Sequence, residues 1–252
     1  MSNRFKQNWR STFKTSKFAG QLLPSATKKQ IMSTQVIVEK AVIKEVDFAR
    51  IKQKAVKKFL SNLGLNKLVG FTKMRPECYN PAFDSSYHVH HKIFLIRSNI
   101  DRVWNEYKTI HPKDAWNGAM VSFGLQYSTK KNSINYLNDP YAGMEKGQII
   151  ILNLRLFWGG FNIAVAHEVA EVNEEKRLIK LCYMRGGASE GSQWITLRET
   201  VEGFTEVSHQ TFYKSSSNFR DKTLYPRLHT KAITEFHVNV KRQAEAIKKS
   251  ES

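Results

Sequence analysis

The sequence has few cysteines, few prolines and no long apolar run. Cys78 and Cys182 are its two cysteines, and the longest apolar stretch, residues 149–161, is interrupted by Asn153 and Arg155. A membrane-spanning helix needs roughly 20 consecutive apolar residues, so no transmembrane span is expected. The first residues also lack the apolar core of a secretory signal. We therefore expect a cytoplasmic protein, or an organelle-targeted one if the source is eukaryotic, while a single disulfide stays open.

Acidic residues are scarce in the N-terminal third. The first 38 residues contain none, and residues 1–80 hold 17 Lys+Arg against 4 Asp+Glu, a net charge of +13 out of +18 for the whole chain. Residues 81–252 hold 23 against 18, a net charge of only +5. A field of this sign favours anionic surfaces. The charge distribution therefore indicates an anionic membrane surface or nucleic acid as a partner of residues 1–60.

Aromatic residues alternate with basic ones at the start of the chain. Phe5, Trp9 and Phe13 recur every four residues, so a helix here would carry an aromatic stripe with basic flanks. Three interpretations stay open for residues 1–33: a flexible basic tail, an arm that docks on anionic lipid or nucleic acid, and an organellar transit peptide.

Residues 34–84 predict a helical segment followed by a linker. Asp47 is a candidate N-cap, and Gly64 is a candidate stop. Between them, apolar residues recur at helical spacing. The predicted buried face consists of Phe48, Ile51, Ala55, Phe59 and Leu63. Residues 66–84 contain prolines and glycine and predict a connection with little regular structure.

Residues 85–252 predict an α+β domain. An alternating strand at 87–96 is followed by a helix that starts near Ser98. Six more strands are expected at 120–128, 147–157, 163–172, 178–184, 193–199 and 204–213. A long amphipathic helix at 223–249 then buries Ile233, Phe236 and Val240. This order of elements predicts a curved antiparallel sheet of six or seven strands around a long C-terminal helix.

One segment after the first predicted strand resembles a known superfamily. The run Ser98-Asn99-Ile100-Asp101-Arg102-Val103-Trp104 is similar to the opening of the polyketide cyclase and lipid-transfer superfamily. Its members share the helix-grip fold of the steroidogenic-acute-regulatory-protein-related domains and of the major birch pollen allergen. Residues 186–192 and 210–213 also resemble landmarks of a bacterial and plant family of unknown function in this group. The resemblance covers residues 87–249 and leaves the first 80 residues unexplained.

The resemblance implies a cavity between the sheet and the last helix that takes a lipid, sterol, quinone or polyketide-like molecule. Its expected lining is apolar and aromatic with a few polar groups. The predicted pocket residues are Trp104, Leu152, Leu154, Trp158, His167, Tyr183, Arg185, Trp194, Phe212, Ile233, Phe236 and Val240. A turn at 186–192 is expected to bring Glu190 beside Arg185, as a structural salt bridge or as a gate at the pocket mouth.

Two histidines are candidates for acid-base chemistry. His167 shares the apolar face of its strand, so it either contacts a ligand and moves a proton or is a core histidine bonded to a neighbour. His209 is the second candidate. A metal site at His88, His90 and His91 is not expected, because only two of these side chains share a strand face. No cofactor is expected either.

Three functions remain as hypotheses. The leading one is a binding or carrier protein for a hydrophobic small molecule, because the sequence shows no nucleophile-base pair and no phosphate-binding glycine loop. The second is a nucleic-acid- or ribosome-associated protein that binds through its basic N-terminal third. The third is an enzyme of the cyclase or hydratase type that uses His167 or His209.

Overall fold

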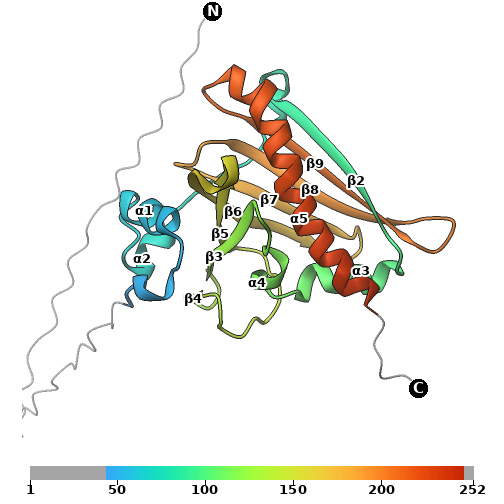
Figure 1. Cartoon of the computed structure of the whole chain (residues 1–252), viewed down its shortest axis with the longest axis horizontal. Coiled ribbons are helices and arrows are strands. Elements are labelled where there is room, and N and C mark those ends of the chain that lie inside the picture. The colour runs from blue at the N-terminus through green and yellow to red at the C-terminus, as the bar shows by residue number, and fades with distance from the viewer. Residues whose placement is uncertain (1–43, 247–252) are drawn as a thin grey trace, which may run out of the picture. The chain divides into compact units, whose positions relative to one another are not determined.

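The computed structural model describes residues 44–246, so the basic extension at 1–33 and the last six residues lie outside the described part (Figure 1). The helical elements are η1 (Phe48–Arg50), α1 (Lys54–Asn62), α2 (Leu68–Phe71), η2 (Pro81–Ser86), α3 (Ile100–Thr109), α4 (Pro112–Ala115), η3 (Phe157–Gly159), η4 (Arg220–Leu224) and α5 (Tyr225–Glu245). The strands are β1 (Pro76–Glu77), β2 (His88–Ile96), β3 (Val121–Ser128), β4 (Ser133–Asn135), β5 (Gln148–Leu156), β6 (Phe161–Asn173), β7 (Leu178–Met184), β8 (Glu190–Glu199) and β9 (Thr205–Lys214).

Within residues 44–246, the strands form one antiparallel sheet in the order β2-β9-β8-β7-β6-β5-β3-β4, and β1 pairs with the end of β7. The seven strands predicted from alternation are confirmed as β2, β3 and β5 to β9. β1 and β4 were not predicted, because strands of two and three residues are too short to show a period. The edge strands β2 and β4 lie far apart, so the sheet is open.

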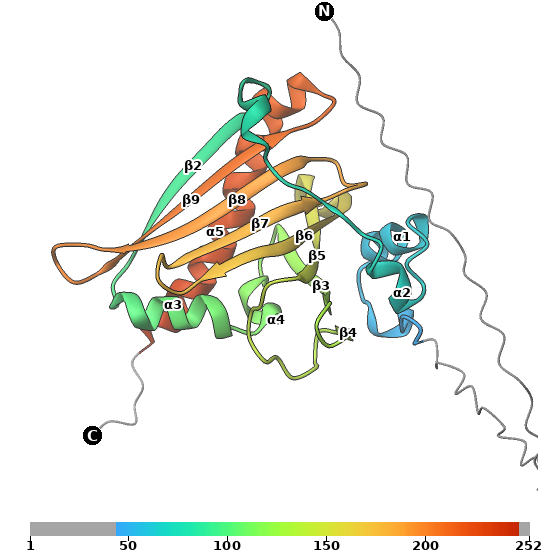
Figure 2. The same cartoon turned by 180° about the vertical axis from the view of Figure 1, so that it is seen from behind.

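The long helix α5 lies across one face of this sheet (Figures 1 and 2). Its buried side chains include Ile233, Phe236, Val240 and Ala244, as the periodicity predicted. They pack against inward-facing residues of the strands and of α3 in one hydrophobic core. Phe236 also stacks on Trp116, with 4.2 Å between ring centroids. A curved antiparallel sheet with a long C-terminal helix against it is the predicted helix-grip α+β fold, which is therefore confirmed.

A second apolar layer covers the other face of the sheet. Residues 46–71, with α1 and α2, pack on outward-facing side chains of β3, β5 and β6. Phe71 stacks on Tyr127 at 4.9 Å between ring centroids. Part of the segment expected as helix and linker therefore completes a core of its own against the sheet.

The buried face predicted for residues 48–63 was correct only in part. Ile51 is buried, and Phe48 and Phe59 pack against the same core, but the phase predicted along α1 was wrong. Val56 and Leu60 are the buried residues of this helix, whereas Leu63 is 39% exposed. The reason is a break in the helix: Asp47 caps only the short η1, and the chain is extended at Ile51 before α1 begins at Lys54. This break shifts the helical phase, which the spacing of apolar residues did not reveal.

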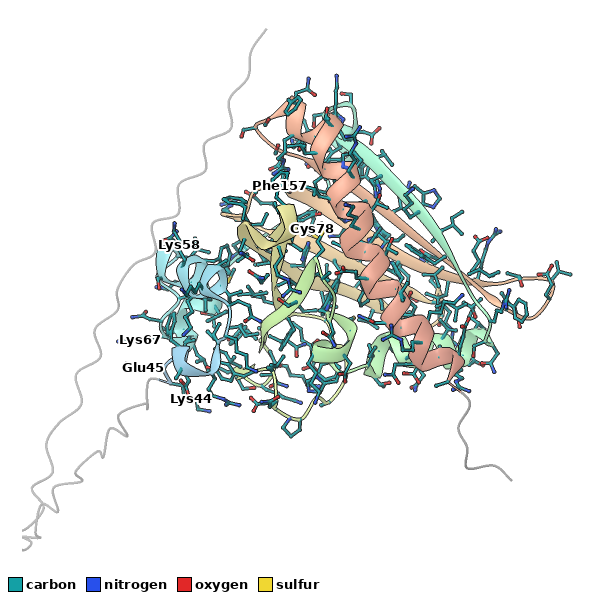
Figure 3. The ribbon with its side chains drawn as sticks, viewed as in Figure 1. Lys44, Glu45, Lys58, Lys67, Cys78 and Phe157 are labelled. Atoms are coloured by element: carbon teal, nitrogen blue, oxygen red, sulfur yellow. A yellow bond between two sulfur atoms is a disulfide. The ribbon has the colours of Figure 1, made fainter. Side chains whose placement is uncertain are left out.

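A disulfide joins the segment before η2 to the middle of the sheet. Cys78, labelled in Figure 3, is bonded to Cys182 of β7, and their Cα atoms are 4.8 Å apart. The bond follows directly after β1, which pairs with the end of the same strand.

None of the helices in the described part of the chain has the length and hydropathy that a bilayer span requires.

Candidate ligand-binding site

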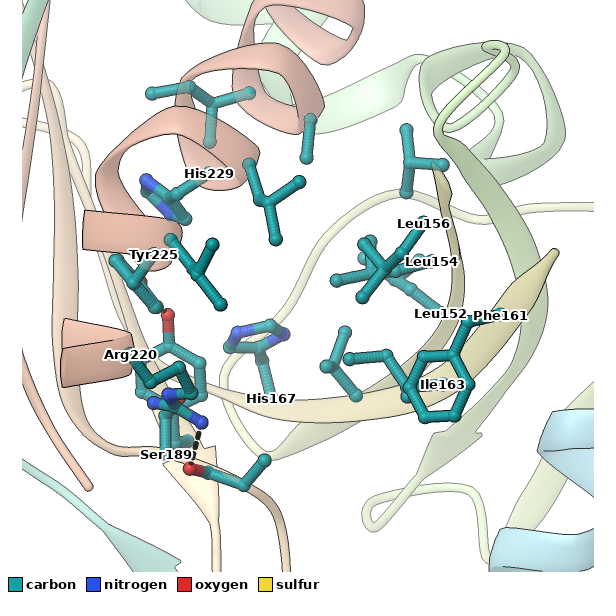
Figure 4. Close-up of a pocket in the computed structure, with 18 of the residues that line it drawn as sticks. Leu152, Leu154, Leu156, Phe161, Ile163, His167, Ser189, Arg220, Tyr225 and His229 are labelled. Atoms are coloured by element: carbon teal, nitrogen blue, oxygen red, sulfur yellow. Dashed lines mark hydrogen bonds between the residues drawn. The ribbon is translucent and has the colours of Figure 1, made fainter. Parts of the chain in front are cut away.

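A cavity of about 460 Å³ lies between the sheet and the N-terminal half of α5 (Figure 4). Its apolar wall comes from β5 and β6 on one side and from η4 and α5 on the other. The apolar wall residues on these elements include Leu152, Leu154, Leu156, Ile163, Val165, Leu224, Leu228, Ala232 and Ile233. Ligand sites in proteins typically have volumes of roughly 300–1,000 Å³, so this cavity has the size of a binding site.

Strand alternation explains the sheet side of this wall. Leu152, Leu154 and Leu156 are two residues apart in β5, so their side chains share one face. Across the antiparallel pair, Leu152 lies opposite Val165, and Leu154 lies opposite Ile163. These two adjacent rows form a continuous apolar surface on the sheet. The residues of η4 and α5 cover this surface from the other side of the cavity.

The cavity reaches the protein surface beside η3. Phe157 and Phe161 line it, and they are also 60% and 55% exposed. Phe157 has a φ of +51°, a left-handed conformation that is uncommon for a bulky residue. Two aromatic side chains therefore stand at the mouth.

Arg220 of η4 lines the same cavity near Ala188 and Ser189. Its guanidinium pairs with the buried carboxylate of Asp221 at 3.0 Å and donates to Ser189 Oγ at 2.8 Å (Figure 4). It also donates to the carbonyl of Ala188. Because these protein acceptors engage it, Arg220 ties η4 to the turn before β8.

A chain of buried hydrogen bonds ends at the cavity wall. The Tyr107 hydroxyl lies 2.5 Å from His237 Nδ1, and His237 Nε2 lies 2.7 Å from His209 Nδ1. His209 Nε2 then bonds to Gln193 Oε1 at 2.9 Å, and Gln193 Nε2 bonds to His167 Nε2 at 2.9 Å. The chain therefore runs from the core beneath α3 to His167, which lines the cavity.

The direction of this chain follows from its chemistry. The amide nitrogen of Gln193 only donates, so Nε2 of His167 accepts, and Gln193 Oε1 accepts from His209. Each neutral imidazole has one N–H, so His209 accepts from His237, and His237 accepts from the Tyr107 hydroxyl. A buried hydroxyl without an acceptor is costly, so the donating Tyr107 is the arrangement that satisfies every member.

Burial keeps these rings neutral at neutral pH. It lowers the pKa of His167 to about 4, because desolvation disfavours the charged form. It lowers the pKa of His209 to about 3, with smaller contributions from the neighbouring histidines. The pKa of His237 also lies well below its usual range for the same reason. The rings therefore act as neutral hydrogen-bonding groups.

Five of the predicted pocket residues line the cavity. They are Leu152, Leu154, His167, Tyr183 and Ile233. His209 does not line it but bonds to Gln193, which does. The side chain of Trp158 lies outside the described residues.

The other predicted pocket residues lie elsewhere. Trp104, Phe236 and Val240 belong to the core nearer the C-terminal end of α5, and Trp104 Nε1 donates to Glu174 at 2.5 Å. Trp194 and Phe212 pack with Tyr79 on the other face of the sheet, because inward-facing Gln193 and Tyr213 are their neighbours. Their aromatic character suggested the pocket, but their strand position excludes it.

The expected pair of Arg185 and Glu190 is also not formed. Arg185 pairs with Glu77 at 2.8 Å, and Glu190 pairs with Lys214 at 2.8 Å. Each carboxylate or cation takes the partner on the adjacent strand, since cross-strand neighbours lie closer than the two ends of the turn. The cation that does line the cavity, Arg220, was missed.

Three further lining residues, Gln193, Tyr225 and His229, were not predicted from the sequence. Strand alternation could have placed Gln193 on the inner face, because it is on the same side of β8 as Ile195 and Leu197, which are both buried. His229 lies one helical turn before Ile233, so extending the period of α5 would have placed it on the buried face. Within residues 44–246 no three His, Cys, Asp or Glu side chains are placed to hold a metal ion.

Several solved structures show a similar arrangement at low sequence identity. They include major latex-like protein 151 of Panax ginseng (11% identity, TM-score 0.46, 64% of this chain and 99% of that chain) and truncated norcoclaurine synthase of Thalictrum flavum (17%, 0.46, 64% and 96%). The KanY protein is a third (14%, 0.46, 64% and 99%). No protein-family model and no curated protein matches the chain, so its likeness to a family of unknown function stays a prediction. What the chain's own elements establish is the helix-grip fold with a cavity under α5.

Proposed function

We propose that this protein binds or carries a hydrophobic small molecule, such as a lipid, sterol, quinone or polyketide-like compound, between the sheet and α5. The cavity of about 460 Å³ carries this proposal, because its wall is almost wholly apolar and it reaches the surface at Phe157 and Phe161. An apolar space of this size without an occupant leaves its lining without packing partners on one side. A bound apolar molecule would supply them.

Solvent extraction of the purified protein tests the proposal directly. Organic extraction followed by mass spectrometry is expected to release an apolar compound that denatured protein, carried through the same purification, does not retain. A protein that neither releases such a compound nor binds apolar probes would contradict the proposal.

A variant that fills the cavity gives a second test. Ala232→Trp places an indole into the space from α5, so binding of the uncharged fluorescent probe N-phenyl-1-naphthylamine is expected to fall at least tenfold. Thr234→Trp adds the same side chain on the exposed side of α5 and is expected to bind the probe like the wild type. Equal binding by both variants would place the probe outside the cavity.

An enzyme of the cyclase or hydratase type is the second candidate function. It is favoured by one observation, namely that His167 lines the cavity. With a pKa of about 4, this side chain is neutral at pH 7 and suits hydrogen bonding to a carbonyl or weak acid-base work. His209 would act only through Gln193 and His167, so a catalytic role falls to His167.

The basic N-terminal third remains a predicted binding region. Residues 1–43 lie outside the described residues, so the three interpretations of this segment stay predictions. Affinity for nucleic acid or for anionic vesicles that falls steeply with salt would support a binding arm.

A further inference from the structure

One ring nitrogen on the cavity wall is free to bind a ligand. His167 of β6 lines the cavity, and its Nδ1 forms no hydrogen bond to a described residue. This atom is open to the space of the cavity, whereas Nε2 of His229 is shielded from it. Figure 4 shows the ring of His167 between the leucines of β5 and the first turns of α5.

The hydrogen bonds of Gln193 place a proton on this nitrogen. Gln193 Nε2 donates to Nε2 of His167 at 2.9 Å and to the Tyr183 hydroxyl at 3.2 Å. Its Oε1 accepts from His209 at 2.9 Å. A neutral imidazole carries one N–H, so the proton of His167 is on Nδ1. The opposite amide orientation would reverse the whole chain and leave the buried hydroxyl proton of Tyr107 without an acceptor.

The ring of His167 presents a donor and not a charge. Burial lowers its pKa to about 4, because desolvation disfavours the imidazolium form. At neutral pH the wall therefore offers one N–H group, surrounded by apolar side chains such as Val165 and Ile163.

The other polar side chains of the described lining are already engaged. Arg220, the one cation among them, is held by the buried carboxylate of Asp221 and by Ser189. Tyr183 and Tyr225 bond to each other through their hydroxyl groups. An anionic ligand would therefore lack a free counter-charge, and burying a charge without one is strongly unfavourable.

The position of His167 in β6 determines how a ligand would lie. Phe161 at the mouth is six residues before His167 in the same strand, which is roughly 20 Å at the rise of a β-strand. Ile163 and Val165 line the cavity between them. A ligand that reaches His167 with a polar end therefore lies along an apolar wall with the rest of its length.

We propose that the ligand is an uncharged, elongated apolar molecule with a carbonyl oxygen at its buried end, and that this oxygen accepts from Nδ1–H of His167. The inference rests on the proposed function and narrows its ligand class. Ketones and quinones fit it, whereas pure hydrocarbons and fatty-acid anions do not. A hydroxyl oxygen could accept the same bond, but its own proton would then be buried without a partner.

Three probes of similar shape test this inference by displacing N-phenyl-1-naphthylamine from the purified full chain. 2-Acetylnaphthalene offers a carbonyl, 2-isopropenylnaphthalene replaces the oxygen with a CH₂ group, and 2-naphthoate carries a charge. The wild type is expected to bind the ketone about fivefold to tenfold more tightly than the alkene, and 2-naphthoate most weakly. A cavity without a free donor would favour the alkene, because the carbonyl must lose its water on binding.

Two variants assign the preference to its atom. His167→Phe keeps a flat ring but removes the donor, so the preference for the ketone is expected to be lost while the alkene still binds. His91→Phe changes an exposed histidine that bonds to Ser208 outside the cavity, and it is expected to keep the wild-type preference.

The ring itself gives a readout that needs no ligand. In ¹⁵N NMR spectra of the wild type, His167 is expected to show the tautomer with its proton on Nδ1. The tautomer with its proton on Nε2 would overturn the inference, because Nδ1 would then be an acceptor.

The outcomes separate the two proposals. Equal or tighter binding of the alkene or of 2-naphthoate by the wild type, or an unchanged preference in His167→Phe, overturns the inference and leaves the proposed function intact. Failure of N-phenyl-1-naphthylamine and of all three probes to bind overturns both. If His167→Phe does not fold, the order of the wild-type affinities and the tautomer decide.

Discussion

At the scale of single residues, buried imidazoles dominate the polar interior of this protein. His90, His167, His209 and His237 are each at most 7% exposed, and His229 joins them through its bond to His90. Each ring is bonded to another ring, a hydroxyl or an amide rather than to a carboxylate. The consequence is a set of neutral histidines whose tautomers are determined by their partners.

Tyr107→Phe tests the far end of the hydrogen-bond chain. The substitution removes the donor to His237 Nδ1 and leaves a buried acceptor unpaired, which costs about 1–3 kcal/mol. Urea unfolding is expected to show this loss in the free energy of unfolding. Tyr127→Phe is the matched control, because its hydroxyl bonds to the side chain of Asn132 in a partly solvated turn and is expected to lose less than about 1 kcal/mol. Equal losses of unfolding free energy in the two variants would argue against a hydrogen-bond chain in which every donor and acceptor is paired.

The same histidines predict loss of stability in acid. Well above pH 6.5 these rings are unprotonated in both states, whereas near and below pH 6.5 the unfolded chain takes up protons that the folded protein does not. The free energy of unfolding is therefore expected to fall as pH drops from 6.5 towards the folded pKa values of about 4 for His167 and about 3 for His209. Each such ring contributes up to roughly 2 kcal/mol between pH 6.5 and 5. Urea unfolding at pH 7.5, 6.5 and 5 measures the slope, and a constant free energy over this range would contradict the prediction.

Part of the candidate site follows from single-residue patterns and part does not. Strand alternation put His167 on the inner face together with Val165, and the structure places both at the cavity. Arg220 lies in a π-helical turn, whose i→i+5 hydrogen bonds shift side-chain directions away from the α-helical period, so its position was not predictable.

At the scale of elements, long strands were predictable and the phase of α1 was not. Strands of seven or more residues contain several repeats of the two-residue alternation, and each is flanked by turn-forming residues. The position of α1 depends on tertiary contacts instead: Gln53 Nε2 donates to the Phe123 carbonyl at 2.7 Å, just where the helix is about to begin. A bond between segments 70 residues apart leaves no local signal in the sequence.

Gly124 allows α1 to approach the sheet. The register of β3 against β5 shifts between Phe123 and Leu125, so Phe123 joins the inner core and Leu125 the outer one. A Cβ on Gly124 would lie 2.7 Å from the Ile151 carbonyl oxygen and 2.9 Å from a methyl group of Val56. The close approach of helix and strand therefore requires a residue without a side chain.

Gly124→Ala is expected to destabilise the protein by about 1–3 kcal/mol, because α1 or β5 must shift to admit the methyl group. Thermal unfolding followed by circular dichroism measures the effect. Gly160→Ala is the control: the nearest atom to its added Cβ is 3.3 Å away, and its φ of −64° suits alanine. A melting temperature equal to that of the wild type would show that α1 is not held against this strand.

At the scale of the whole molecule, the cysteine pair links two distant parts of the chain. The bond between Cys78 and Cys182 spans 104 residues and joins the segment that follows the outer layer to the centre of the sheet. The sequence alone left this pairing open, because two cysteines so far apart in sequence give no local signal. Where the protein is located in the cell stays a prediction.

Removal of the disulfide is expected to lower stability by about 3–5 kcal/mol, because an open chain of this length gains loop entropy when it unfolds. The comparison is wild type with and without reductant, beside the double variant Cys78→Ser and Cys182→Ser. Reductant is expected to lower the melting temperature of the wild type to that of the serine variant and to leave the variant unchanged. A wild type that is insensitive to reductant under denaturing conditions would contradict the prediction.

The presence of the cavity could not be predicted from the pattern of apolar residues. The inward positions of β5, β6 and α5 predict apolar contact whether the space between them is filled or hollow. The volume depends on how far the first turns of α5 stand from the sheet, which in turn depends on η4 and on the contacts of Arg220 with the turn before β8.

The order of the strands has a consequence for how the binding site comes into being during synthesis. β2 can pair with β9 only after more than 100 further residues have been synthesised. One wall of the cavity is formed by η4 and α5, near the end of the chain. A nascent chain therefore exposes the apolar rows of β5 and β6 until its last segment leaves the ribosome. Closure of the site is a late event in folding, and an apolar ligand present at that moment would be enclosed as the helix docks.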